Sequence, residues 1–151
     1  MHIHVDDLTG PEIFELLQAH LAGMRALSPP ESVHALDLAD LRHPSVTFWT
    51  VWQGVDLMGC GALKELDATH GELKSMRTSA KHLRKGVAKT LLQHIVGVAR
   101  SRGYARLSLE TGPVEGFKPA HSLYANMGFT ECGKFANYSD DLFSVFMTKT
   151  L

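Results

Sequence analysis

The chain has 151 residues, a formal net charge of −1 and 44% hydrophobic residues. This length can bury a core within one domain, spanning residues 1–151, without disulfides or metals. The near-neutral charge argues against general affinity for nucleic acid, which needs a basic surface. No apolar run approaches the length of a membrane span. We therefore expect a globular protein whose partners include neither nucleic acid nor a membrane.

The two cysteines indicate the compartment. Cys60 and Cys132 are far apart, form no CxxC motif and stand in apolar surroundings. Two free thiols are typical of a reducing compartment. The first residues, MHIHVDD, resemble neither a signal peptide nor an anchor. We expect a cytoplasmic protein, and the possibility of a homodimer is left open.

The first third of the chain predicts a short strand and two helices. Residues 1–6 form the strand, and Thr9, Gly10 and Pro11 open the first helix. The sequence SPPE at 28–31 fits a capping box that starts a short helix through residue 36. Two helices joined by a Pro-rich turn would form an exposed lip that selects a substrate. Ser32 and His34 in this lip are candidate substrate contacts, although a plain helix-surface role fits them equally well.

The remaining elements predict a mixed sheet. Strand patterns at 46–52, 55–66 and 72–78, separated by breaks, indicate an antiparallel meander. A long helix then ends at Gly103, and the strand YARLSLETG follows, which suggests a right-handed parallel crossover. PAHSLYANMGF is a second short helix closed by Gly128, and the tail supplies one or two final strands.

The long helix starts without a capping side chain. The five residues before Gly86 are KHLRK, with no Ser, Thr, Asp or Asn to bond the free backbone N–H groups. Residues 81–89 carry four cationic side chains, which the positive end of the helix dipole disfavours unless an anion binds. Gly86 and Ala88 leave room for a phosphate against the backbone. The stretch therefore predicts a phosphate site.

The distribution of charge agrees with this prediction. Nine of the 15 Lys and Arg residues fall between positions 74 and 106, and no Asp or Glu occurs between Glu72 and Glu110. The alternative is a solvated basic face, which is what such runs usually are. The missing cap and the small residues together favour the phosphate site.

Three segments carry a family resemblance. RKGVAKTLL after a strand, then LSLETG, then PAHSLYANMGF, resemble the GNAT superfamily of acetyl-CoA-dependent N-acetyltransferases, and GCGALKEL, KSMRT and SVFMTK resemble its small bacterial YsnE-type members. The similarity covers nearly the whole chain. It implies an α/β (α+β) fold in one GNAT-like domain, with helices flanking a mixed, mostly antiparallel sheet. It also implies that acetyl-CoA, the cosubstrate, enters where this sheet splays between residues 73–78 and 106–110.

The resemblance also implies a set of cofactor-binding residues. In the family a Gln/Arg-x-x-Gly-x-Gly/Ala loop holds the CoA pyrophosphate, largely through backbone N–H groups, and residues 83–88 align with it although Leu83 departs from the usual Gln or Arg. Phe117 stands where the family often has an Asn that contacts pantetheine. Residues 76–78 would pair their backbone with pantetheine. The candidates are Met76, Arg77, Thr78, Leu83, Arg84, Lys85, Gly86, Val87, Ala88, Lys89 and Phe117.

Two residues are candidates for catalysis. Tyr124 aligns with the family's general acid, and with an ordinary pKa near ~10 a tyrosine donates to a nascent thiolate with little penalty. Glu72 aligns with a carboxylate that often removes the proton of the amine, directly or through water. The structural alternatives are a core tyrosine and an ion pair between Glu72 and a neighbouring cation. A backbone N–H near Met76 could polarise the thioester carbonyl.

Other functions are less well supported by the sequence. Nine histidines lack metal-ligand spacing, so no metal is expected. Gly86-x-x-Lys89-Thr90 lacks the glycines of a Walker loop. A noncatalytic acyl-CoA sensor remains the alternative to an enzyme. The lip and the aromatic strand at 46–52, which could close over an acceptor, favour a small-molecule amine as the acetyl acceptor.

Overall fold

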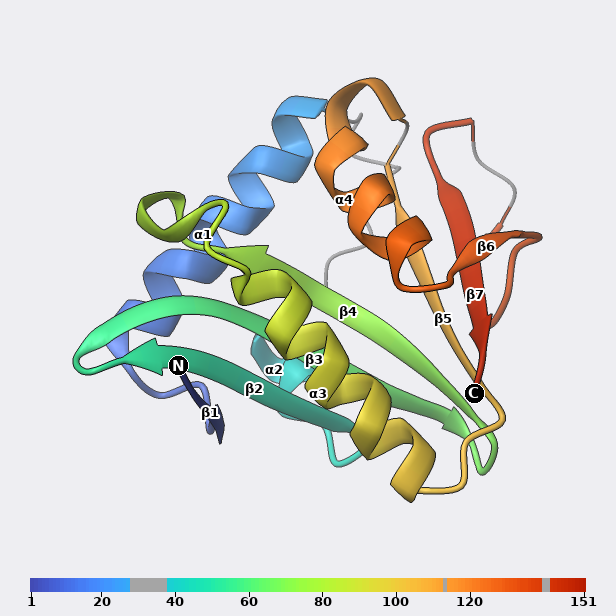
Figure 1. Ribbon diagram of the computed structural model, residues 1–151, viewed down its shortest axis with the longest axis horizontal. Helices are drawn as coiled ribbons and strands as arrows, with labels where there is room; N and C mark the ends of the chain where they lie inside the picture. The colour runs from blue at the N-terminus through green and yellow to red at the C-terminus, as the bar shows by residue number, and fades with distance from the viewer. Residues whose placement is uncertain (28–37, 113, 140–141) are drawn as a thin grey trace.

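Seven strands form one sheet in the computed structural model, which describes residues 1–27, 38–112, 114–139 and 142–151. The strand order is β1-β2-β3-β4-β5-β7-β6 (Figure 1). Among these neighbours, only β4 and β5 run parallel. The strands are β1 (His2–Val5), β2 (Val46–Gln53), β3 (Asp56–Asp67), β4 (His70–Thr78), β5 (Arg106–Thr111), β6 (Thr130–Cys132) and β7 (Val145–Thr150).

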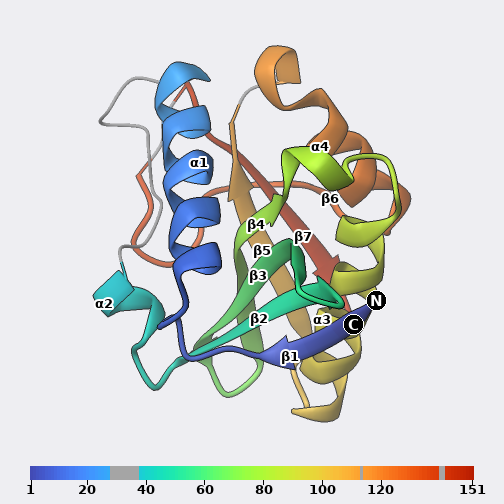
Figure 2. The same ribbon diagram turned by 90° about the vertical axis from the view of Figure 1, so that its left-hand side faces the viewer.

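Helices cover both faces of this sheet. α1 (Pro11–Leu27) and α2 (Leu38–Leu41) lie on one face, and α3 (Val87–Ser101) and α4 (Val114–Asn126) lie on the other (Figure 2). α3 carries six buried side chains, among them Leu92 and Ile95, which are fully buried against the sheet. A smaller core under α1 includes Ile13, Leu16 and Phe48. The amphipathic patterns of α1 and α3 therefore position both helices by burying one stripe of each.

β4 and β5 separate along their length. Their parallel pairing joins His70 to Arg106 and ends at Leu73 with Leu109, although β4 continues to Thr78. The two strands diverge visibly from their shared lower end (Figure 1). The predicted meander, parallel crossover and splayed sheet are thus confirmed.

A bulge interrupts β4 just past this divergence. The register with β3 shifts between the pairs Cys60–Arg77 and Ala62–Lys74, and Ser75 adopts a φ of 57°, in the left-handed region. Such a bulge inserts one residue and re-aims the side chains that follow. A Cβ on Gly61, across from the bulge, would overlap Sδ of Met76. Gly61 therefore leaves the space that the Met76 side chain occupies.

The short helix predicted for residues 28–36, with Ser32 and His34, lies outside the described residues. The tail, for which one or two strands were expected, forms two, β6 and β7. β7 pairs with β5 along its full length from Arg106 to Thr111, so the end of the chain supports the strand that borders the divergence.

The packing of β3 against β4 gives a test of stability. A Cβ on Gly59 would lie 2.9 Å from the backbone oxygen of Arg77 and 3.0 Å from Cγ1 of Val87, at the start of α3. We expect Gly59→Ala to lower the free energy of unfolding in urea by about 1–3 kcal/mol, because a backbone oxygen cannot move aside cheaply. Gly97→Ala is the control: nothing lies within 4 Å of a Cβ there, so the substitution should raise stability by about 0.5–1 kcal/mol. Equal effects of the two variants would contradict this account.

Candidate active site

The N-terminus of α3 is open, as the sequence predicts. Gly86 is its N-cap residue, with a φ of 80° and no capping hydrogen bond from a side chain, and the first turn contains no acidic residue. Arg84 also has a positive φ, 62°. Successive backbone N–H groups in a turn that includes left-handed residues can form an anion-binding concavity. This local backbone holds Arg84 in a conformation that costs a non-glycine residue roughly 1 kcal/mol or more.

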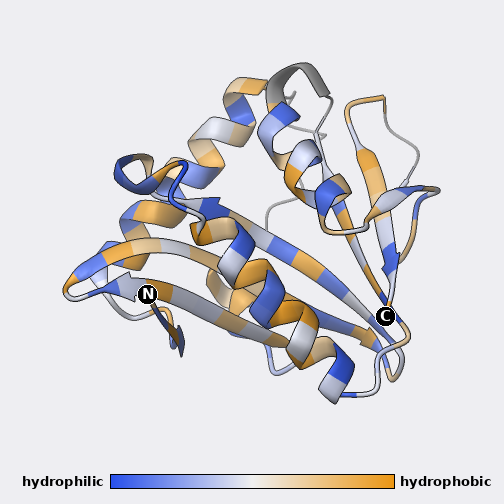
Figure 3. Cartoon of the chain, viewed as in Figure 1, coloured by the Kyte–Doolittle hydropathy of each residue, from blue (hydrophilic) through white to orange (hydrophobic). Residues whose placement is uncertain are grey.

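A groove of about 570 Å³ runs from this helix start to α4, and we call it the basic groove. The loop ahead of α3, which contributes to the groove wall, is rich in hydrophilic residues (Figure 3). Arg77, Arg84 and Lys89 contribute cationic side chains to its wall, and α4 contributes apolar ones. The wall comprises Met76, Arg77, Thr78, Ala80, His82, Leu83, Arg84, Gly86, Val87, Ala88, Lys89, Pro119, Ala120, Leu123 and Tyr124.

Nine of the 11 candidate cofactor residues line this groove. Lys85 is not among the wall residues, and its ammonium lies 3.3 Å from Nδ1 of His82, which is itself buried. Phe117 also lies elsewhere: it breaks the helical geometry of α4, with φ −123° and ψ 22°, and its ring packs against Gly112. Phe117 therefore borders the neighbouring cavity and not the groove.

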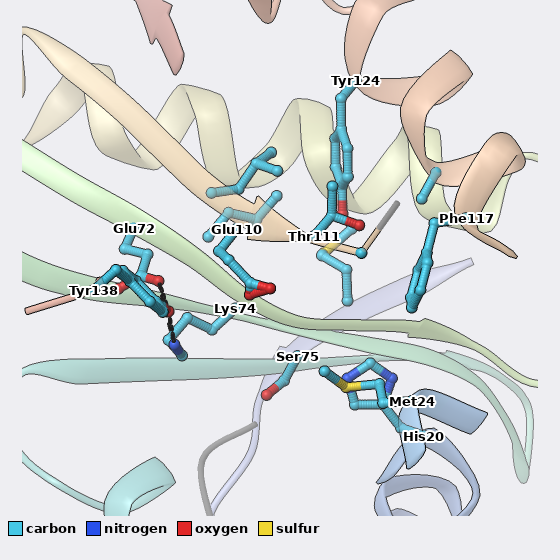
Figure 4. A pocket seen from close by; sticks show the side chains of 15 residues that line it. His20, Met24, Glu72, Lys74, Ser75, Glu110, Thr111, Phe117, Tyr124 and Tyr138 are labelled. Atoms are coloured by element: carbon cyan, nitrogen blue, oxygen red, sulfur yellow. Dashed lines mark hydrogen bonds and ion pairs between the residues drawn. The ribbon is translucent and has the colours of Figure 1, made fainter. Parts of the chain in front are cut away.

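The second hollow, the central cavity, lies where β4 and β5 diverge (Figure 4). α1 contributes His20 and Met24, and α4 contributes Phe117 and Tyr124. Met76, Ala120 and Tyr124 line both the cavity and the basic groove, so these residues form a shared boundary. The cavity wall comprises His20, Met24, residues 72–76, residues 109–112, Phe117, Ala120, Tyr124 and Tyr138.

Glu72 belongs to a buried polar cluster in the cavity wall. Its Oε2 accepts hydrogen bonds from Tyr138 Oη at 2.6 Å and from Lys74 Nζ at 3.2 Å (Figure 4). Lys74 Nζ also donates to Tyr138 Oη at 2.7 Å. The Glu72 and Lys74 side chains are only 3% and 8% exposed, respectively. The ion pair with a neighbouring cation, which we expected as the alternative role of Glu72, is therefore present, and the base role stays a prediction.

Tyr124 reaches the boundary between the two hollows from α4. It is 7% exposed, and its ring packs edge-on against Phe129. Burial raises the pKa of Tyr124 above the ordinary tyrosine value. The expectation of an unperturbed pKa is therefore wrong: the hydroxyl stays protonated to higher pH, and its proton is harder to remove.

The cavity contains residues that sequence reasoning did not select. His20 lies on α1, and burial, followed by the nearby charge of Arg77, lowers its pKa to about 4. This imidazole is neutral at pH 7. Lys74 could have been found because residues two apart on a strand share a face, whereas Tyr138 carries no such local signal. The predicted substrate residues Ser32 and His34 lie outside the described part of the chain.

Across the described ranges, no three His, Cys, Asp or Glu side chains are grouped so that they could hold a metal ion. The helices in those same ranges include none that is long and apolar enough to span a membrane.

The acetyltransferase (GNAT) family profile matches residues 12–129. The chain belongs to this family. It is 60% identical over 151 residues to the protein called "Uncharacterized N-acetyltransferase YsnE" of Bacillus subtilis, with all of both chains covered. It is 54% identical to YedL of Escherichia coli, also called an N-acetyltransferase, covering 99% of this chain and 94% of YedL. The family and these relatives make the chain an acetyl-CoA-dependent N-acetyltransferase, and they favour the enzyme over the sensor.

Other similarities agree with the GNAT assignment. The chain is 35% identical to an "IAA acetyltransferase" of Azospirillum brasilense, covering 83% of this chain and 81% of that protein. An acyl-CoA N-acyltransferase structure from Klebsiella pneumoniae aligns with a TM-score of 0.81 at 27% identity, covering 99% and 97% of the chains. A GNAT acetyltransferase structure from Elizabethkingia anophelis with acetyl-CoA bound has the same fold, with a TM-score of 0.71 at 18% identity and coverage of 99% and 97%.

The open start of α3 gives a binding test. We expect Gly86→Glu to abolish the thermal stabilisation that acetyl-CoA gives the wild type, because a carboxylate and its side chain would fill the position of the phosphates. Gly103→Glu is the matched control: Gly103 also has a φ near 80° and open space around its Cβ position, but it lies past the other end of α3. Gly103→Glu should still be stabilised. Stabilisation of the wild type by ATP and not by acetyl-CoA would contradict the assignment of the groove.

Proposed function

We propose that this enzyme transfers the acetyl group of acetyl-CoA to the amine of a small molecule by direct attack in a ternary complex. One observation carries the proposal: Met76, Ala120 and Tyr124 line both the basic groove and the central cavity. A donor lying in the groove and an acceptor lying in the cavity would meet at this boundary. Holding two reactants together in this way removes much of the entropic barrier to reaction.

The basic groove is the proposed donor site. The free N–H groups at the start of α3 and the side chains of Arg84 and Lys89 would hold the pyrophosphate. Beyond Leu73, the edge of β4 has no pairing with β5, so the backbone of residues 76–78 would bond pantetheine like a neighbouring strand. We propose that the nine candidate residues that line the groove contact the cofactor directly. Lys85 and Phe117 would contribute from positions next to the groove.

The boundary residues would carry the chemistry. A backbone N–H near Met76 would polarise the thioester carbonyl, since a fixed donor stabilises the charge that develops on that oxygen. Tyr124 would give its proton to the departing thiolate. Burial raises the pKa of Tyr124, so its hydroxyl is a weaker acid than an exposed tyrosine. The same burial also disfavours a charged thiolate, and this cost would favour transfer of the proton to sulfur.

The central cavity is the proposed acceptor site. Its wall combines apolar side chains, such as Met24 and Phe117, with charged and polar ones, such as Lys74 and Glu110. Convergent polar groups in an otherwise apolar pocket suit a small molecule. We retain Ser32 and His34 as proposed contacts from sequence. IAA is a second acceptor to test, because the relative from Azospirillum brasilense is called an "IAA acetyltransferase".

We place the activity in the cytoplasm. Cys60 and Cys132 are both free thiols, which a reducing compartment preserves. Burial raises the pKa of Cys60 to about 12, so this thiol is not a reactive nucleophile.

Thiol release from acetyl-CoA tests the function. The acceptor panel is phenethylamine, putrescine, glucosamine, glycine, phenylalanine and IAA. We expect at least one free amine to accelerate thiol release well above the rate without acceptor, and Gly86→Glu to remove that acceleration. Efficient acetylation of lysines on intact proteins, with no transfer to any free amine, would overturn the small-molecule assignment.

Tyr124→Phe tests the proton donor. The substitution keeps the ring and its packing but removes the hydroxyl, so we expect kcat to fall by about 10²–10⁴ while acetyl-CoA affinity changes little. In the wild type, ionisation of Tyr124 should not lower kcat as pH rises to about 10, the ordinary tyrosine pKa, because burial raises the pKa of this group.

Tyr104→Phe is the matched control for this variant. Tyr104 is equally buried and donates to Glu65 at 2.8 Å, but it lines neither hollow. Its loss should cost stability and leave kcat near the wild-type value. A Tyr124→Phe enzyme with wild-type kcat at neutral pH would show that Tyr124 serves only packing.

A further inference from the structure

The side chain of Arg77 has a buried nitrogen without a partner. Within the described part of the chain, Nε of Arg77 is buried and takes part in no hydrogen bond, and no acidic side chain there forms an ion pair with the guanidinium. An unpaired buried donor is costly, and it is more costly when it carries charge. A folded protein keeps such a group where strain or a ligand gives it a function. For a guanidinium, that ligand would be an anion.

The guanidinium lies against α1, next to the central cavity. Its Nη1 is 3.2 Å from the Cβ position of Gly23, and His20 and Met24 on the same helix line the cavity (Figure 4). The missing side chain at Gly23 leaves the room that the guanidinium occupies. Burial first, and then the charge of Arg77, lowers the pKa of His20 to about 4, so this charge acts on the cavity wall. An anion bound beside His20 would therefore lie within reach of Arg77.

The basic groups in the cavity wall are less suited to hold an anion. Lys74 Nζ already pairs with Oε2 of Glu72 at 3.2 Å and donates to Tyr138 Oη at 2.7 Å. If Lys74 turned to another anion, the Glu72 side chain, which is only 3% exposed, would lose its counter-charge. The imidazole of His20 is neutral at pH 7. Arg77 is therefore the cation beside the cavity that an anion would bind.

We propose that the Arg77 guanidinium binds the carboxylate of the acceptor, and that the acceptors are therefore α-amino acids. This assignment rests on the proposed function, which supplies the amine, and it adds the class of molecule that carries that amine. A guanidinium presents two parallel N–H groups that match the two oxygens of a carboxylate. The Arg77 side chain would turn to meet them, and its Nε has no hydrogen bond to break in doing so. This role of the side chain is separate from the backbone pairing of residues 76–78 with pantetheine.

The neighbouring groups suit an α-amino acid with an apolar side chain. Arg77 directly follows Met76, which lies at the boundary where the amine would attack, and consecutive Cα atoms are about 3.8 Å apart. The amine and the carboxylate of an α-amino acid are attached to one carbon, so they could reach two such neighbouring points together. Met24 and Phe117 supply an apolar wall for the rest of the acceptor. We therefore expect acceptors such as leucine and phenylalanine.

The test compares each amino acid with the amine that lacks only its carboxylate. The pairs are phenylalanine with phenethylamine, and leucine with isopentylamine. At pH 7 we expect the wild-type kcat/KM for the better amino acid to exceed that for its paired amine by at least about tenfold. Arg77→Met, which is apolar and unbranched, should lower this ratio by about 10–100-fold, the usual effect of losing hydrogen bonds to a charged group. Arg77→Lys keeps the charge without the fork and should restore part of the ratio.

The controls separate this role from other roles of an arginine. Arg102→Met removes the C-cap residue of α3, whose Nη2 donates to Thr47 at 2.8 Å on an exposed surface, and it should match the wild type with all four acceptors. Arg77→Met should melt at or above the wild-type temperature, because it removes an unpaired buried donor. A clear loss of stability would show that the guanidinium is already satisfied and would overturn the proposal. A higher KM for acetyl-CoA in Arg77→Met, with an unchanged preference for amino acids, would assign Arg77 to a phosphate of CoA and would also overturn it.

A binding measurement decides the case in which no acceptor is acetylated. The compound 3-phenylpropanoate is phenylalanine without its amine, and 3-phenylpropanol also lacks the charge. We expect 3-phenylpropanoate to raise the Tm of the wild type and not that of Arg77→Met, and the alcohol at the same concentration to raise neither. Without acetyl transfer, this shift would keep the carboxylate site while the proposed function fails, and its absence would overturn both.

Where transfer does occur, the kinetics decide. Transfer by the wild type without a preference for amino acids, or equal losses for both members of a pair in Arg77→Met, would overturn the carboxylate assignment. Either result would leave the transfer chemistry standing.

Discussion

Separation of two neighbouring parallel strands is the constraint on which the rest of this structure depends. Beyond Leu73 and Leu109, the facing edges of β4 and β5 lose each other's backbone partners. A buried backbone group left without a partner costs about 1–3 kcal/mol. The separation persists because β3 holds the far edge of β4 through Thr78, and β7 holds β5 through Thr111. The exposed edges then favour any ligand that supplies the missing hydrogen bonds.

The two hollows draw their charged groups from different faces of the sheet. The open start of α3 and the basic groove lie with α4 on one face, and the charged cavity wall lies with α1 on the other. The buried cluster of Glu72, Lys74 and Tyr138 fixes that wall, because breaking one member would leave a charge buried. Met76, Ala120 and Tyr124 border both hollows, so a ligand that orders them from one hollow would alter the affinity of the other hollow for its ligand. That second ligand would then alter the affinity for the first by the same factor.

Local sequence features were enough to predict the open start of α3. The missing cap at Gly86, the basic loop and the periodicity of α3 are all contained within about 20 residues, so the sequence states them directly. Most of the central cavity could not be predicted in this way. Tyr138 meets Glu72 across 66 positions of sequence, and only the folded sheet shows that contact. The resemblance put Phe117 among the cofactor-binding residues, but it lies at a break in the helical geometry of α4 and borders the cavity, and no periodicity reports such a break.

The bulge at Ser75 changes the face of the sheet to which the later side chains of β4 point. In a regular strand, Glu72, Lys74 and Met76 would all point to the same face, and Arg77 would point to the other. Instead, Glu72 and Lys74 face the cavity, Met76 packs with the core beside α3, and the Arg77 guanidinium lies 3.2 Å from the Cβ position of Gly23 on α1. One extra residue thus lets a single strand line the central cavity with the side chains before the bulge and the basic groove with the side chains after it. Loss of that residue would exchange the two orientations, turning Met76 toward the face of α1 and Arg77 toward the face of α3.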